Sequence, residues 1–143
     1  MLKDMISHVK NEMGFAVSIT GTSVEVADVD VQGYAALTLV CPVSPGDNSS
    51  DSITYKLEHK EEGGTYEAVT AEDLLMQYGA NDGSVASGVF ATVAGNGVPQ
   101  MVSVGYIGDG RYLRLTAEES NGATSHVVAA AIVKEGLQKP QDD

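Results

Sequence analysis

The sequence has one cysteine, no tryptophan and only 8 basic residues in 143. Because Cys41 is alone, no internal disulfide can form, which excludes a disulfide-stapled secreted scaffold and fits synthesis in the cytoplasm. No apolar run approaches the length that a membrane-spanning helix needs. Residues 1–10 also lack the apolar segment and the cleavage site of a secretory signal. We therefore expect a protein that has no membrane partner.

Positive charge is scarce as well, since 20 acidic residues outweigh the 8 basic ones and give a net charge of −12. Binding to nucleic acids or to anionic membranes requires clustered lysine and arginine, so we expect neither partner. The acidity has two interpretations. It provides solubility and mutual repulsion, or it marks a surface that faces solvent on a large assembly or meets a basic partner.

Short apolar runs separated by Gly, Ser, Thr, Asn and Asp predict strands joined by turns. The clearest alternation places Ile53, Tyr55 and Leu57 on one face of a strand, and residues 65–69 form the returning arm of a hairpin. In the last predicted strand, four residues share a face: Val127, Ala129, Ala131 and Val133. We predict strands at residues 15–20, 23–26, 35–41, 53–58, 65–69, 88–94, 99–107, 111–118 and 127–133. The fold class is all-β, a single antiparallel β-sandwich or jelly-roll-like domain.

Two short helices are expected beside the strands. Apolar residues recur at spacings of three and four near the N-terminus, which predicts an amphipathic helix over residues 2–13 that ends at Gly14: Leu2, Met5, Ile6, Val9 and Met13. Thr70 is expected to cap a second helix over residues 71–78. The predicted organisation is an N-terminal arm (1–14), a β-sandwich domain (15–135) and a flexible C-terminal tail (136–143).

The segment that begins at Asp28 imitates the start of an EF-hand loop. Asp28, Asp30 and Gln32 offer oxygen ligands at alternate positions, and Gly33 stands sixth. However, Leu39 occupies the position that requires a bidentate glutamate. We expect no calcium site, and we expect a melting temperature that neither calcium nor EDTA changes.

No catalytic pattern is found. The histidines show neither an H-x-x-x-H spacing nor a paired-cysteine partner: His8, His59 and His126. Cys41 lies in an apolar run and is interpreted as a buried small hydrophobe. Neighbouring strand residues point to opposite faces, so the pairs Glu61–Glu62 and Glu118–Glu119 cannot share a proton and are interpreted as charged turn or edge residues. We expect no catalytic residue, no metal, no cofactor and no enzymatic activity.

Four segments together resemble a group of small bacteriophage virion proteins. They are residues 2–10 (LKDMISHVK), 31–43 (VQGYAALTLVCPV), 55–69 (YKLEHKEEGGTYEAV) and 104–115 (VGYIGDGRYLRL). The last is the most similar, with five residues in register: Tyr106, Gly108, Arg111, Tyr112 and Arg114. The chain departs from the group at residues 44–52 and 79–98.

The resemblance implies a capsid decoration (cement) protein that is made in the host cytoplasm and binds the outside of the phage head. Its partners would be the major capsid protein and copies of itself, with a homotrimer as our hypothesis because capsids offer three-fold sites. A tail, connector or fibre protein is the alternative. A carbohydrate- or host-surface-binding module is a further one, which the low aromatic content of 6% disfavours.

A protein without a catalytic site acts through its surfaces, and two sets of residues are candidates for contacts. The N-terminal apolar stripe is the first: Leu2, Met5, Ile6 and Val9. Arg111 and Arg114 are the second, and they either pair with acidic neighbours inside the fold or anchor an interface.

Overall fold

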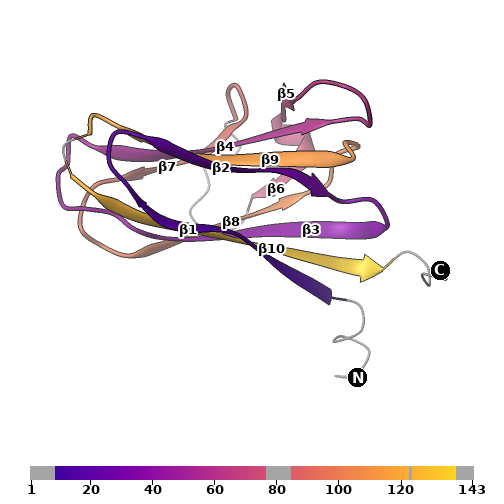
Figure 1. The fold of residues 1–143 in the computed structure, drawn as a ribbon, viewed down its shortest axis with the longest axis horizontal. Helices are drawn as coiled ribbons and strands as arrows, with labels where there is room; N and C mark the ends of the chain where they lie inside the picture. The colour runs from indigo at the N-terminus through magenta and orange to yellow at the C-terminus, as the bar shows by residue number, and fades with distance from the viewer. Residues whose placement is uncertain (1–8, 77–84, 123, 138–143) are drawn as a thin grey trace.

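The computed structural model describes residues 9–76, 85–122 and 124–137, which form two stacked antiparallel sheets (Figure 1). Sheet A contains, in spatial order, β1 (Val9–Ile19), β10 (His126–Leu137), β3 (Tyr34–Ser44), β8 (Gln100–Tyr106) and β6 (Leu74–Met76). Sheet B contains β2 (Ser23–Asp30), β9 (Tyr112–Ser120), β4 (Ser52–Lys60) and β5 (Glu67–Ala68), and β7 (Val89–Ala94) also pairs with β4. The predicted all-β antiparallel sandwich is confirmed.

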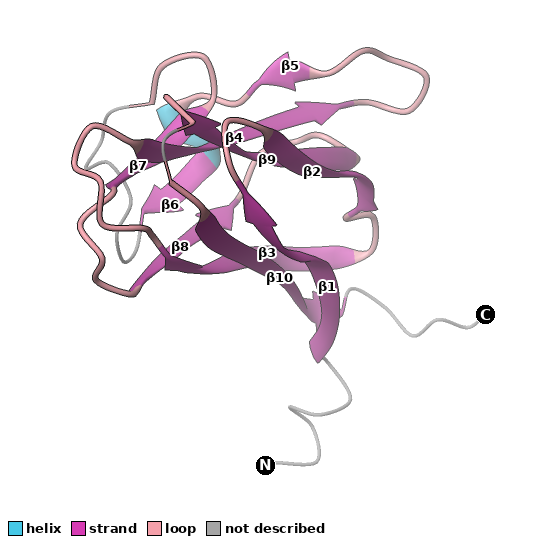
Figure 2. Cartoon of the chain, turned by 60° about the vertical axis from the view of Figure 1, so that its left-hand side comes forward, coloured by secondary structure: helices cyan, strands magenta, loops and turns pink. Residues whose placement is uncertain are grey.

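Strands that follow one another in the chain alternate between the sheets, as they do in jelly rolls. Strands β1 and β3 lie in sheet A, whereas β2 and β4 lie in sheet B, and β7 to β10 repeat the alternation. The connections therefore cross between the layers at the two ends of the sandwich (Figure 2). Strand β1 begins beside the end of β10, because Val9 pairs with Glu135.

The core lies between the sheets and is built by strict alternation. Ile53, Tyr55 and Leu57 of β4 are fully buried, while the residues between them are partly exposed. Cys41 of β3 is fully buried as well, and burial raises the pKa of its thiol to about 12. The thiolate is therefore negligible at neutral pH, as expected of a packing residue.

Tyr55 is an exception to the rule that buried hydroxyls are hydrogen-bonded, because its Oη has no partner among the described residues. The change Tyr55→Phe should therefore keep the free energy of unfolding or raise it by about 1 kcal/mol. Tyr106→Phe is the matched control, since the Tyr106 Oη bonds to His59 Nδ1 and accepts from the Gly110 N–H, both at 2.7 Å. The free energy of unfolding of Tyr106→Phe, measured by urea unfolding, should fall by about 1–2 kcal/mol. Equal losses in the two variants would show that Tyr55 is bonded in solution.

The helix predicted over residues 2–13 is wrong where the structure describes it. Residues 9–13 belong to β1, where Val9 to Met13 pair with Glu135 to Ala131 of β10. A free helix of this length is marginal in water, whereas a strand against β10 gains a ladder of hydrogen bonds. Leu2, Met5 and Ile6 lie outside the described residues.

The second predicted helix, over residues 71–78, is also wrong. Thr70 does bond to Asp73, whose Oδ2 accepts from the Thr70 N–H at 2.9 Å, but only a single 3₁₀ turn follows, η1 (Ala71–Asp73). Leu74 then enters β6 and pairs with Tyr106 of β8, which buries its side chain in the core. Pairing with β8 thus ends the helix after one turn. Residues 77 and 78 lie outside the described part of the chain.

Candidate functional site

The outer face of sheet A is made of apolar and small residues. Side chains of directly paired residues lie on the same face of a sheet. Ala131 of β10 pairs with both Met13 and Val40, and Val40 pairs with Ser103, which places one set of residues across four strands. We call this set, extended to Leu75 of β6, the apolar face: Met13, Ala16, Ser18, Thr38, Val40, Pro42, Leu75, Met101, Ser103, Gly105, Val127, Ala129, Ala131 and Val133.

Large apolar side chains on this face are open to solvent. Met13 is 70% exposed, Leu75 54%, Val127 51% and Met101 47%. Strand spacing and rise give the face an in-plane area of about 400 Å². That is the size of the largest apolar patches on monomers, which are often functional. The set contains no Asp, Glu, Lys or Arg, but Glu135 follows Val133 on the same side of β10 and is exposed, so the face ends at a carboxylate.

Two charged residues of β1 and β10 point inward, away from the apolar face. Glu12 of β1 pairs with Ile132, which is buried in the core. The Lys134 side chain is only 5% exposed, and its Nζ lies 3.0 Å from Glu12 Oε2. Inward-pointing charges are a common protection of edge strands against pairing with other chains. Strand β1 therefore protects its edge with a charge that points away from the apolar face.

The outer face of sheet B is polar and holds Arg114, whereas Arg111 lies in the turn just before β9. Arg114 of β9 donates to Glu58 Oε1 at 2.7 Å and lies over the Tyr66 ring, 4.4 Å from its centroid. This hydrogen bond from Arg114 holds the pKa of Glu58 below its ordinary value. Arg111 pairs with Asp30 at 3.3 Å and with Glu62. Each arginine thus has acidic partners inside the fold, and neither belongs to the apolar face.

The candidate calcium segment is already engaged with protein groups. Asp28 Oδ1 accepts from the Tyr66 hydroxyl at 2.8 Å. Asp30 Oδ1 accepts from the Gln32 N–H at 2.9 Å and from Arg111. These carboxylates therefore bond to different protein groups.

Sequence reasoning grouped Val127, Ala129, Ala131 and Val133 correctly, but it did not show that they face outward. Their neighbours Val128, Ala130 and Ile132 form the core-facing set. Because both faces of β10 are apolar, alternation alone cannot say which face is buried. The pairing with Met13 and Val40 identifies the outer one.

The chain matches no protein-family model and no curated protein. Among solved structures it is similar to the CBM22-1 xylan-binding domain of Paenibacillus barcinonensis Xyn10C (12% identity, 92% of this chain and 82% of that one, TM-score 0.49). It is also similar to the SPBc2 prophage-derived protein YomS (14% identity, 87% and 96%, TM-score 0.39). A third similar structure is a chain of the cyanophage Pam1 capsid asymmetric unit (15% identity, 90% and 84%, TM-score 0.42). These similarities are too distant to indicate a function.

No helix in the described ranges combines the length and the apolarity needed to cross a bilayer.

Proposed function

We propose that this chain is a non-enzymatic structural protein of a phage virion, which binds the outside of the capsid through its apolar face. The observation that carries the proposal is a face of exposed apolar side chains, with Glu135 at its border, on a chain with a net charge of −12. The phage identity of the partner rests on the sequence resemblance described above.

The distribution of charge favours a large shell as the partner over a single soluble protein. The apolar face has a carboxylate only at its border, that of Glu135, whereas the opposite outer face carries Glu25, Lys56, Glu58, Arg114 and Glu118 around a hollow of about 320 Å³. A chain built in this way can bury one face and leave the acidic one in solvent. The acidic surface then repels other particles and keeps the decorated assembly dispersed.

The apolar face is too small to form a stable interface by itself, so we expect further contacts beside it. A stable interface buries about 800 Å² on each partner, roughly twice the in-plane area of the apolar face. We propose that Leu2, Met5, Ile6 and Val9 add the missing area, since the chain leads from them directly into β1 at the border of the face. Contacts between copies, in a homotrimer, would supply the rest.

The sugar-binding alternative has less support. Sugar rings stack on exposed aromatic side chains, but the lining of the hollow over sheet B contains none. A tail, connector or fibre role would use the same face with another partner, so the experiment must separate head from tail.

The experiment is co-sedimentation of the chain with undecorated heads and with purified tails of a phage that encodes it. We expect saturable binding to heads and none to tails. A chain that starts at Val9 keeps all of β1 and should melt at the same temperature, but it should bind heads at least 10-fold more weakly. Each apolar side chain lost from an interface costs about 1.5–3 kcal/mol of binding free energy, before the entropy cost of ordering it is subtracted. A loss of 1.4 kcal/mol raises the dissociation constant about 10-fold.

The possible outcomes separate the claims. Binding to tails alone would support the tail alternative. Binding to neither particle would overturn the virion proposal. Full affinity in the chain that starts at Val9 would show that the N-terminal residues are dispensable.

A further inference from the structure

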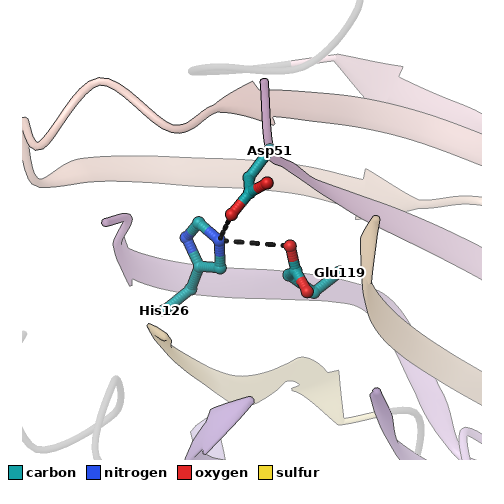
Figure 3. A group of neighbouring side chains, drawn as sticks. All are labelled: Asp51, Glu119 and His126. Carbon is teal, nitrogen blue, oxygen red and sulfur yellow. Dashed lines mark ion pairs between the residues drawn. The ribbon is translucent and has the colours of Figure 1, made fainter. Parts of the chain in front are cut away.

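Three buried ionisable side chains meet at the end of the sandwich away from the start of β1. Asp51 precedes β4, Glu119 lies near the end of β9, and His126 begins β10 (Figure 3). All three side chains are fully buried. One nitrogen of the imidazole and one oxygen of each carboxylate lie within 4.8 Å of one another.

A hydrogen bond from Gly46 decides which nitrogen of His126 carries the proton. The Gly46 N–H donates to Nδ1 at 2.9 Å, so Nδ1 is unprotonated and the neutral ring carries its proton on Nε2. Nε2 points between the two carboxylates (Figure 3), at 3.6 Å from Asp51 Oδ2 and 3.4 Å from Glu119 Oε2. The ring therefore presents one N–H to both carboxylates.

Asp51 keeps its negative charge despite its burial. Its Oδ2 accepts from the N–H and the hydroxyl of Thr124, both at 2.9 Å. Burial raises the pKa of this carboxyl, but the hydrogen bonds from Thr124 and the nearby His126 outweigh burial and bring the pKa below its ordinary value. Asp51 is therefore ionised at neutral pH.

Glu119 is held by backbone groups. Its carboxylate accepts from the N–H groups of Gly21 and Gly122. No lysine or arginine within residues 9–76, 85–122 and 124–137 forms an ion pair with Glu119 or Asp51. The ring of His126 is thus the nearest group that can gain a positive charge between them.

A second proton can enter the ring only at Nδ1, because Nε2 is already protonated. Within the described ranges, Asp51 and Glu119 are the charged groups that contact the ring, and both attract a positive charge. The β1 residue that pairs with His126 is apolar, Ile19. A proton on Nδ1 would face the Gly46 N–H, and two donors cannot share a hydrogen bond. Protonation of the ring therefore breaks its bond to Gly46.

Gly46 connects the loop between β3 and β4 to two neighbouring segments. Its carbonyl accepts from the N–H of Gly97, in the connection between β7 and β8, at 2.9 Å. A Cβ on Gly46 would lie 2.7 Å from Thr124 Oγ1, so the loop packs tightly against the segment that leads into β10. A shift of Gly46 away from His126 therefore disturbs both contacts.

We propose that His126 is a pH switch that holds the loop between β3 and β4 at neutral pH and releases it in acid. The neutral ring accepts from Gly46 and keeps the loop closed. When Nδ1 takes up a proton, the imidazolium pairs with Asp51 and Glu119, the Gly46 N–H loses its acceptor, and the loop opens. The two sheets stay paired, so the change is confined to this end of the sandwich. The switch does not depend on the proposed docking on a capsid.

The test is NMR of the full chain at about pH 7.5 and about pH 5, the range in which histidine commonly gains a proton. The nitrogen shifts of the His126 ring should show a proton on Nε2 alone at the higher pH and on both nitrogens at the lower pH. Hydrogen exchange of the Gly46 amide, corrected for the intrinsic effect of pH, should become at least 10-fold faster relative to its protected state. The Arg111 amide is the control, since it donates to the backbone carbonyl of Lys60 at 2.8 Å and should keep its protection.

A variant separates the ring from other groups that titrate. In His126→Asn, the side-chain oxygen can accept from Gly46 in place of Nδ1, but the side chain does not gain a proton. Its Gly46 amide should be equally protected at both pH values. If the variant does not fold, the wild-type spectra decide. A proton on Nδ1 at neutral pH, a ring that stays neutral at about pH 5, or Gly46 protection that survives ring protonation would overturn the proposal. A loss of protection in acid that His126→Asn shares would overturn it as well.

Discussion

Replacing Glu119 by alanine should lower the free energy of unfolding by about 2–5 kcal/mol, because the N–H groups of Gly21 and Gly122 lose a charged acceptor. These two donors lie in the turns β1–β2 and β9–β10, so both turns lose an anchor at once. The measurement is urea unfolding of the variant and the wild type under the same conditions.

Glu118→Ala is the matched control, since Glu118 is adjacent in the sequence and exposed. Exposed substitutions usually change stability by less than about 0.5 kcal/mol. The two variants should therefore differ by at least about 2 kcal/mol. Similar small effects would show that water satisfies the glycine N–H groups and that the Glu119 carboxylate is not an anchor.

The change Ala131→Glu should weaken binding to undecorated heads at least 100-fold, which corresponds to about 2.7 kcal/mol. Ala131 lies at the centre of the apolar face, between Met13 and Val40. A carboxylate there reaches solvent in the free chain, but it is buried without a partner once the face is covered. The melting temperature of the free chain should stay close to that of the wild type.

Ala94→Glu is the control for charge and side-chain size. Ala94 of β7 is exposed on the outer face of sheet B, where it pairs with Ser52. Its glutamate adds the same charge to the chain but lies away from the proposed interface. Head binding should be within about 3-fold of the wild type, which is about 0.7 kcal/mol. Equal losses in both variants would mean that total charge, and not the apolar face, governs binding.

The sequence predicted the strands well because alternation is a local property. The same local reasoning failed at the N-terminal half of β1. Met13 and Phe15 are two residues apart, and a regular strand would place both on one face. The register shifts between them, so Met13 is 70% exposed while Phe15 is 6% exposed. Neither the spacing of the apolar residues nor Gly14 reveals that bulge.

The burial of Asp51, Glu119 and His126, whose side chains lie close together (Figure 3), could not be predicted for a different reason. Asp51 is far from Glu119 and His126 in the chain, and each of the three follows or precedes a turn, where charged residues are usually solvated. Glu118 and Glu119 appear equivalent in the sequence, yet the alternation of β9 buries only the second. The order of the strands brings the three side chains together, and no local spacing encodes that order.

The central claim, that the apolar face contacts the capsid, is tested most directly by oxidation of methionines in free and head-bound chain. Met13 and Met101 both lie on the face and are 70% and 47% exposed, so peroxide should oxidise both in the free chain. Mass spectrometry of the head-bound chain should show strong protection of both residues, while hydroxyl-radical labelling of Tyr112 on sheet B should be unchanged. Oxidation of Met13 and Met101 at the same rate in both states, with Tyr112 protected, would contradict the account.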